Sequence, residues 1–312
     1  MAASNDVTLA FLGCGNLGIA ILSGVLASIT EARDNASYAA SGEVPQLIPT
    51  KFIACVRKSA QRIQDAVSKY PSIPVQIFQN DNISGVTEAD AIILGCKPWM
   101  LKEILDVPGM RKALKGKLLI SILAGCPVDQ IEAVLYPDDS IPTEDRCRVV
   151  RAMPNTAAMI RESMTTIETS SPPLPDKWDK LLTWIFTRVG QVSRLPPDNM
   201  DACTSLAGSG PGFVALVLEG LADGGVAMGL PRAEAQLMAA QVMRGTSAMV
   251  LDGEHPSLLR EQICTPGGCT VGGLMVLEEN AVRGSIARSI REATVIASQL
   301  GQGVKNVNGT RH

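Results

Sequence analysis

The chain has 312 residues and a formal net charge of -3, from 28 Lys and Arg against 31 Asp and Glu. This length predicts about two domains of roughly 150 residues each, and the even charge balance argues against a nucleic-acid-binding protein, which normally carries a basic surface. With 46% hydrophobic and 19% charged residues, the composition excludes an intrinsically disordered chain.

The histidine and cysteine contents restrict the possible chemistry. The only histidines are His255 and His312, so a catalytic triad would have to use His255, and a histidine-rich metal site is excluded. The eight cysteines form no C-x-x-C pair, which is typical of core residues in a reducing compartment. With no signal peptide and no uncharged apolar run of membrane-spanning length, we expect a cytoplasmic protein that needs neither a membrane nor a metal.

The first 197 residues alternate between short apolar strands and helices, which predicts a parallel sheet covered on both faces. Strands are expected at 7–12, 51–56, 75–78, 91–96, 117–123, 148–153, 165–168 and 191–195. Helices are expected at 16–29, 59–69, 82–89 and 99–115, and from an N-cap at Asp176, with loops at 31–50 and 138–145. The expected fold class is α/β, with a doubly wound Rossmann sheet at the N-terminus.

After residue 198 the apolar residues recur at helical spacing, which predicts an all-helical domain. The expected helix 213–228 is rich in Ala and Gly, and its charged residues are Glu219 and Asp223. A helix this apolar should be buried, and a small domain offers limited interior. We therefore expect a dinucleotide-binding domain at 1–197 and an intertwined dimerisation and substrate domain at 198–312.

A glycine-rich segment follows the first expected strand. Gly13, Gly15 and Gly18 fit the pattern G-x-G-x-x-G and open the first helix. Gly13 would allow a tight turn, Gly15 would let a pyrophosphate approach the backbone, and Gly18 would let the helix pack closely. A plain strand-to-helix turn is the alternative interpretation.

The second strand ends in Arg57, Lys58 and Ser59, without the carboxylate that normally binds the ribose of NAD. An arginine at this place can pair with a 2'-phosphate, which favours NADPH over NADH, although a solvated basic helix start would look similar. Lys97 follows the fourth strand, where it either positions a cofactor or is a loop charge.

Several separated segments resemble the pyrroline-5-carboxylate reductase family, over essentially the whole chain. These segments are 151–156, 206–211, 222–231 and, as the most specific, 264–279. The resemblance implies reduction of L-1-pyrroline-5-carboxylate to L-proline with NADPH, or with NADH as a second possibility. It also implies a homodimer whose active site lies between one subunit's cofactor domain and its partner's helices, with five dimers commonly forming a decamer.

The resemblance and the motifs together predict the site residues. Thr270 matches the threonine that hydrogen-bonds the ring nitrogen, and is the expected catalytic residue. The expected substrate-binding residues are Ser209, Gly267, Gly268, Cys269 and Thr270. The expected cofactor-binding residues are Gly13, Gly15, Asn16, Leu17, Gly18, Arg57, Lys58, Ser59, Asn82, Cys96, Lys97, Pro98, Leu123, Ala124 and Asn155.

The chemistry of the residues agrees with this resemblance. Residues 265–268 precede a helix, so their amides could bind a carboxylate with help from the helix dipole. The imine can be protonated before it binds, so a strong general acid is unnecessary. An ordinary turn with a threonine N-cap is the alternative for this segment. For the whole chain, the alternatives are a reductase of a related cyclic imine and an NADPH-binding redox sensor.

The chain departs from the family pattern in places. Ala157 stands where the family often has proline, and Pro196 and Pro197 replace a stretch that is often acidic. These differences concern loop geometry and assembly contacts rather than the reaction. His255 is expected in a loop between helices, with a surface or packing role.

Overall fold

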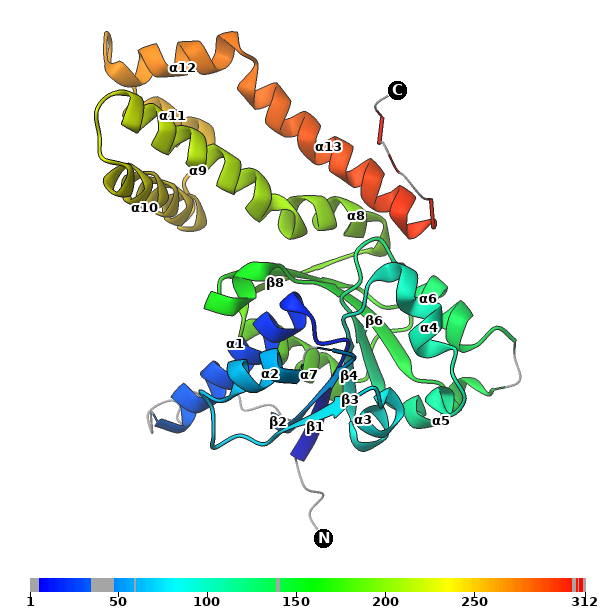
Figure 1. The fold of residues 1–312 in the computed structure, drawn as a ribbon. Helices are drawn as coiled ribbons and strands as arrows, with labels where there is room; N and C mark the ends of the chain where they lie inside the picture. The colour runs from blue at the N-terminus through cyan, green and yellow to red at the C-terminus, as the bar shows by residue number, and fades with distance from the viewer. Residues whose placement is uncertain are drawn as a thin grey trace. The chain divides into compact units, whose positions relative to one another are not determined.

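A computed structural model describes residues 6–34, 48–58, 60–138, 141–304, 307 and 309–310. The chain forms two compact units, one of residues Met1–Gly208 with Ala293–His312 and one of residues Ser209–Glu292. The domain limits expected from the sequence, 1–197 and 198–312, stay a prediction. Each unit is described by itself below (Figure 1).

The first unit contains an eight-stranded sheet in the order β3-β2-β1-β4-β5-β6-β7-β8. Its strands are β1 (Asp6–Leu12), β2 (Ile48–Val56), β3 (Val75–Gln79), β4 (Ala91–Leu94), β5 (Leu118–Ser121), β6 (Arg148–Met153), β7 (Ser163–Glu168) and β8 (Gly190–Leu195). The order of the strands reverses between β1 and β4, and in doubly wound sheets ligands bind at the carboxyl ends of the strands at such a point.

One strand pairing differs from the parallel sheet that the sequence predicts. β6 and β7 are antiparallel, with Ala152 opposite Ile167, whereas the pairing of β7 with β8 is parallel again. The chain between β6 and β7 holds only the short 3-10 helix η4 (Thr156–Ile160). A parallel crossover needs about a dozen residues or more, so this short connection imposes the antiparallel direction.

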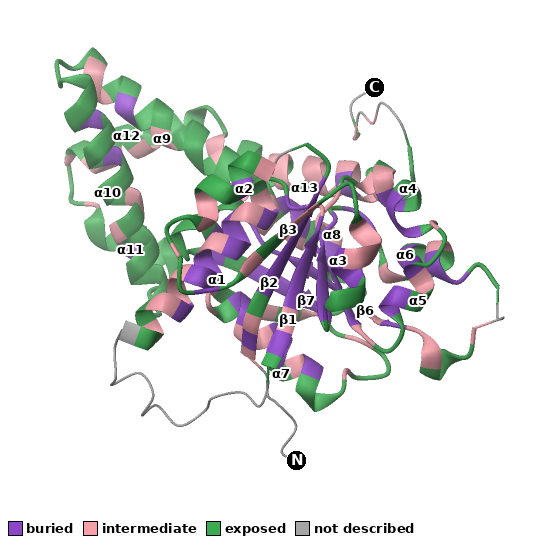
Figure 2. Cartoon of the chain, turned by 60° about the horizontal axis from the view of Figure 1, so that its bottom comes forward, coloured by how far each residue is buried: buried purple, intermediate pink, exposed green. Residues whose placement is uncertain are grey.

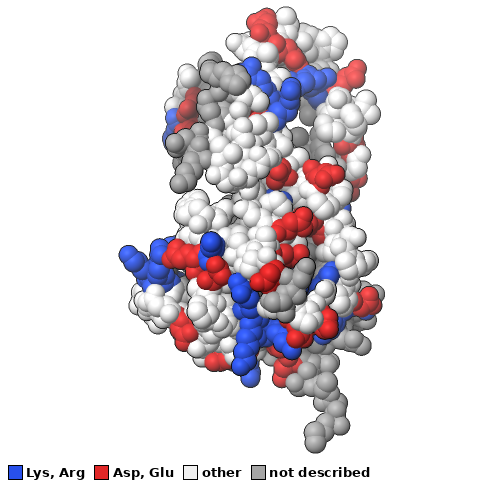
Figure 3. Space-filling model, turned by 90° about the vertical axis from the view of Figure 1, so that its right-hand side faces the viewer, with Lys and Arg blue, Asp and Glu red and all other residues white. Residues whose placement is uncertain are grey.

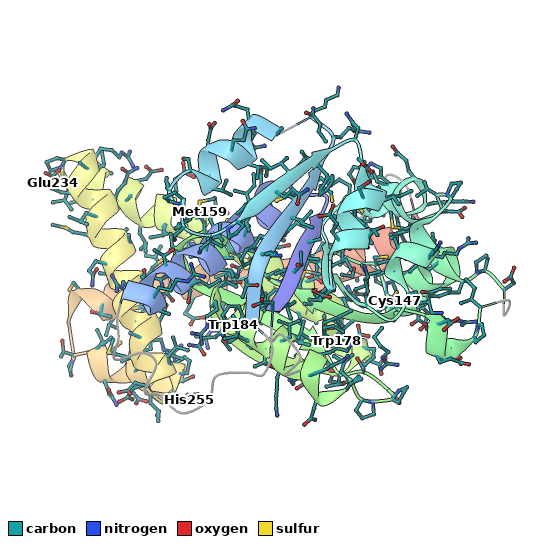
Figure 4. The ribbon with its side chains drawn as sticks, turned by 90° about the horizontal axis from the view of Figure 1, so that it is seen from below. Cys147, Met159, Trp178, Trp184, Glu234 and His255 are labelled. Carbon is teal, nitrogen blue, oxygen red and sulfur yellow. The ribbon has the colours of Figure 1, made fainter. Side chains whose placement is uncertain are left out.

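Helices cover both faces of the sheet, as the apolar runs predict. Alternate residues of β1 enter different cores: Leu9 and Phe11 belong to one apolar cluster, Ala10 and Leu12 to another. The first cluster includes side chains of α1 (Asn16–Asp34) and α7 (Asp176–Thr187), and Trp178 and Trp184 of α7 lie in or against it (Figure 4). The second includes side chains of α3 (Asn82–Glu88), α4 (Leu101–Leu105), α5 (Met110–Leu114) and α6 (Val128–Leu135). The inner strands are accordingly mostly buried in Figure 2, whereas the edge strands β3 and β8 consist of intermediate and exposed residues.

The remaining short elements of this unit connect the larger ones. They are α2 (Ala60–Val67), η2 (Pro98–Met100), η3 (Thr143–Asp145), η5 (Pro197–Asn199), α8 (Met200–Cys203) and the π-helical turn η6 (Thr204–Gly208). On the face drawn in Figure 3, Lys and Arg lie in a few clusters that Asp and Glu border.

Two sequence expectations need correction. The N-cap of α7 is Pro175, and Asp176 is the first helical residue, where its carboxylate still lies next to the positive end of the helix dipole. The segment 31–50 is not loop throughout, because α1 continues to Asp34 and β2 begins at Ile48. Residues 35–47, like Ser59, lie outside the described residues.

The second unit is helical, as expected, and leaves much apolar surface exposed. Its helices are α9 (Gly210–Ala227), α10 (Arg232–Leu251), α11 (Pro256–Ile263), α12 (Cys269–Glu279) and the start of α13 (Val282–Gly301). Its one small core cluster is Ala222, Ala235 and Ala239. Leu216 of α9 is 69% exposed and Leu237 of α10 is 71% exposed, and Figure 2 colours most of these helices as exposed.

The burial expected for the helix 213–228 is therefore not achieved within one chain, since Ala222 is the one buried residue of α9. The helical stretch Pro197–Ala227 is long enough to cross a membrane, and it contains an 18-residue segment with a mean hydropathy of 1.3. Only 11% of that segment is buried in the structure. The same properties are typical of a helix that a second protein subunit covers.

Candidate cofactor and substrate sites

The three glycines around the turn between β1 and α1 have different surroundings, which explain the presence of glycine at each position. Gly13 has a φ of +90°, and a Cβ there would lie 2.9 Å from the backbone nitrogen of Cys96. A Cβ on Gly15 would meet nothing within 4 Å, whereas one on Gly18 would lie 3.3 Å from the Cys14 sulfur. Gly13 is thus required by the turn itself, a side chain at Gly18 would press on Cys14, and Gly15 leaves open space above it.

The N-terminus of α1 follows directly and presents unpaired amides. The first bond of the helix runs from the Ile19 N–H to the Gly15 carbonyl, at 2.8 Å. Helix geometry leaves the N–H groups of Asn16, Leu17 and Gly18 without partners inside α1. Such amides, at the positive end of the helix dipole, form a binding site for a phosphate group.

A cleft of about 570 Å³ lies against this turn and collects several expected cofactor residues. Its lining includes Gly13, Gly15, Arg57, Lys58, Asn82, Cys96 and Lys97. These residues come from four separate strand ends or the turns after them, so the fold brings together what the sequence scatters.

Sequence reasoning missed one charged residue that lines the cleft and one that lies beside it. Glu103 of α4 lines the cleft, and its Oε1 lies 3.5 Å from Nη1 of Arg57. Arg62 of α2 donates a hydrogen bond of 2.7 Å from Nη2 to Oδ1 of Asn16. No sequence signal brings Glu103 next to Arg57, but Arg62 lies on the helix that follows the basic segment and could have been included with it.

The other expected cofactor residues that the structure describes do not line the cleft. Asn16, Leu17 and Gly18 begin α1 beside it. Pro98 opens η2, the side chain of Leu123 is buried, and Ala124 is exposed after β5. Asn155 follows β6, and its side chain already has internal partners. It accepts a hydrogen bond from the Ala157 N–H at 3.0 Å and donates one to the Ala207 carbonyl at 2.9 Å.

Three thiols line the cleft and are poor nucleophiles near neutral pH. Burial raises the pKa of Cys14, of Cys55 and of Cys96 to about 12 in each case. A thiol with such a pKa is protonated near neutral pH, and the thiolate is the reactive form. These cysteines therefore pack the turn and offer neither a nucleophile nor a ready redox sensor.

The expected substrate residues lie in the second unit. The Gly268 N–H donates a 2.9 Å hydrogen bond to the Thr265 carbonyl, which closes a tight turn with Gly267 at a φ of +70°. Gly268 is the N-cap of α12, and its first residues are Cys269, which is exposed, and Thr270, which is half-buried. A threonine N-cap, the alternative for this segment, is therefore not what the structure contains.

Two further expected residues of this unit are placed at helix starts. Ser209 is the exposed N-cap residue of α9, and its side chain makes no capping hydrogen bond. His255, labelled in Figure 4, is exposed and caps α11, since its Nδ1 accepts a 3.3 Å hydrogen bond from the Ser257 N–H. The imidazole thus has a structural partner, as the expected packing role requires.

Sequence comparison decides the family. Residues 197–300 match the model for pyrroline-5-carboxylate reductase dimerisation, and residues 8–125 match the model for NADP oxidoreductases that depend on coenzyme F420. The chain is 58% identical to the pyrroline-5-carboxylate reductase of Lophium arboricola, covering 98% of this chain and 97% of the relative. It is 52% identical to that of Neurospora crassa, covering 99% and 98%. This chain belongs to the pyrroline-5-carboxylate reductase family.

Solved structures of other members of the family have the same fold as this chain. The crystal structure of the Plasmodium falciparum pyrroline carboxylate reductase with NADP bound superimposes with a TM-score of 0.77 at 23% identity, covering 95% of this chain and 98% of that one. The enzyme of Coxiella burnetii gives a TM-score of 0.74 at 24% identity, covering 94% and 98%. The Rossmann sheet and the helical domain are thus the architecture of the family.

Proposed function

We propose that this chain reduces L-1-pyrroline-5-carboxylate to L-proline, with NADPH as the hydride donor, in the last step of proline synthesis. The observation that carries the proposal is the cleft at the glycine-rich turn, whose cations lie beside the N-terminus of α1 in a chain of this family. The name of the Plasmodium relative, solved with NADP bound, supports the choice of dinucleotide.

The cleft and the adjoining N-terminus of α1 fit the phosphate groups of such a cofactor. The amides of Asn16, Leu17 and Gly18 would bind the pyrophosphate, and the open space above Gly15 would let it approach. Arg57 and Lys58 would bind the 2'-phosphate. When bound, the nicotinamide supplies a hydride.

The turn before α12 fits the substrate. The amides at its N-terminus would hold the carboxylate, and the Thr270 hydroxyl would hydrogen-bond the ring nitrogen and orient the C=N carbon. The nitrogen carries its proton on binding, so the hydride adds to an iminium carbon and the product amine forms without a proton from the protein. Orientation and exclusion of water would then supply most of the catalysis.

A homodimer is part of the proposal, and five such dimers could form a decamer. The exposed apolar residues of α9 and α10, together with the match of residues 197–300 to a dimerisation domain, support the dimer. A cytoplasmic location is also proposed, and the eight free cysteines are consistent with a reducing compartment.

The test is a nicotinamide absorbance assay with pyrroline-5-carboxylate, run in parallel with NADPH and NADH. Oxidation that favours NADPH is the expected result. Turnover that favours NADH would keep the reaction and overturn the role of Arg57 and Lys58. No turnover by folded, assembled protein would refute the proposal and favour the alternatives, a reductase of a larger cyclic imine or an NADPH-binding sensor.

A further inference from the structure

We propose that Arg62 is an additional cofactor-specificity residue, which binds the 2'-phosphate of NADPH from the first turns of α2. This inference rests on the proposed function, because it assigns a residue to the same cofactor. Neither the glycine-rich pattern nor the residues at the end of β2 indicate a role for Arg62. The hydrogen bond between Arg62 and Asn16 indicates this role.

The position of Arg62 links two parts of the cofactor site. It belongs to α2, which begins at Ala60 directly after the basic segment at the end of β2, where the adenosine ribose is recognised in this fold. Its guanidinium nevertheless reaches the first residue of α1, next to Gly15 and the amides that fit the pyrophosphate. An anion between these two places would lie beside Arg62.

The hydrogen bond to Asn16 holds the guanidinium without neutralising it. Asn16 offers a neutral amide oxygen, and it engages one of the five N–H donors of an arginine. Among the ion pairs of the described residues, none joins Arg62 to a carboxylate. Arg62 is exposed and keeps its full charge and the rest of its donor fork for a ligand.

The charge of the 2'-phosphate explains why this additional cation matters. A phosphate monoester carries a charge of about -1.5 to -2 near neutral pH. Arg57 shares its charge with Glu103, so that pair is neutral as a whole. Lys58 alone would leave the phosphate incompletely balanced, and Arg62 supplies the missing positive charge.

The experiment compares ligands that differ only in the 2'-phosphate. Wild type, Arg62→Gln and Arg33→Gln are titrated calorimetrically with 2',5'-ADP and with 5'-AMP, and then with NADPH and NADH. Arg33 is the matched control, because it is an exposed arginine that contacts the Ser72 carbonyl from the last turn of α1, at the opposite end of this helix from Asn16. Melting temperatures verify that each variant is folded.

Arg62→Gln is expected to weaken binding of 2',5'-ADP and NADPH about tenfold, as the loss of a charge-assisted hydrogen bond predicts. Binding of 5'-AMP and NADH should stay unchanged, and Arg33→Gln should resemble wild type. Arg62→Lys, which keeps the charge but loses the fork, should fall between wild type and Arg62→Gln.

Three results separate the two proposals. Unchanged NADPH binding in folded Arg62→Gln would overturn the role of Arg62. Equal weakening of NADPH and NADH would also overturn it, because the residue would then act at the shared pyrophosphate. Failure of wild type to bind NADPH at all would instead refute the proposed function.

Discussion

The carboxylate of Glu103 lies 3.5 Å from the guanidinium of Arg57, at the end of β2. In NAD-binding members of this fold a carboxylate at this place comes from β2 itself, and this sequence has none there. The fold nevertheless brings one in from α4. The preference for NADPH therefore depends on two opposing effects: the cations after β2 attract the 2'-phosphate, and the carboxylate of Glu103 repels it.

Arg57→Asp reverses the charge of one of the cations that attract the 2'-phosphate. The variant should raise the apparent KM for NADPH about tenfold while leaving that for NADH nearly unchanged, because only NADPH carries the 2'-phosphate. Steady-state kinetics with each cofactor at saturating substrate measure the ratio. A ratio equal to that of wild type would reject Arg57 as a 2'-phosphate residue.

Glu103→Gln tests whether the carboxylate of Glu103 weakens the binding of the 2'-phosphate. Removal of the carboxylate frees Arg57 and takes a negative charge away from the phosphate, so binding of NADPH should tighten relative to NADH. The side chains of both partners are about two-thirds exposed, so solvent screens the pair and the change should be modest, about two- to fivefold. Fluorescence titration with both nucleotides measures it, and weaker NADPH binding would contradict the argument.

Gly15→Ala and Gly13→Ala are expected to have different effects, the first on cofactor binding and the second on the stability of the fold. A Cβ at Gly15 meets no protein atom within 4 Å, so the melting temperature should hardly change while dinucleotide binding is lost to steric overlap with the pyrophosphate. A Cβ at Gly13 meets the Cys96 backbone at 2.9 Å in a residue with a φ of +90°, so Gly13→Ala should cost about 1–3 kcal/mol of stability. Thermal melts with and without NADPH distinguish the two, and full NADPH binding by Gly15→Ala would contradict the placement of the phosphates.

The parts of the fold that sequence could predict are those that local chemistry determines. The short apolar runs around Leu9 and Ile93 indicate buried strands by their length, and the glycines of the first turn have a local steric reason. The antiparallel direction of β7 follows from the short connection between β6 and β7. The length of that connection is known only once the ends of both strands are known. The pairing of Glu103 with Arg57, and the hydrogen bond from Asn155 to Ala207, join residues far apart in the chain, for which one sequence carries no periodic signal.

Thr270→Ala tests the second half of the proposed site. Loss of the hydroxyl should lower kcat about tenfold, because the ring nitrogen would lose the hydrogen bond that orients the imine. Binding of NADPH should be unchanged, because Thr270 belongs to a compact unit that does not contain the cofactor cleft. Thr270→Ser, which keeps the hydroxyl, is the matched control and should retain most of the activity. A kcat equal to that of wild type in Thr270→Ala would remove this residue from the mechanism.

Leu216→Glu tests whether the apolar surface of α9 and α10 is covered by a second copy of the chain. Leu216 is 69% exposed within one chain, and it lines a groove with Ala215, Ala222 and Ala240. A buried glutamate without a partner costs far more than an exposed one, so the variant should dissociate into monomers. Gln76→Glu, an equal charge change at an exposed position of β3, is the control and should stay assembled. Light scattering at micromolar concentration measures the mass, and a wild type that elutes as a monomer would refute the dimer itself.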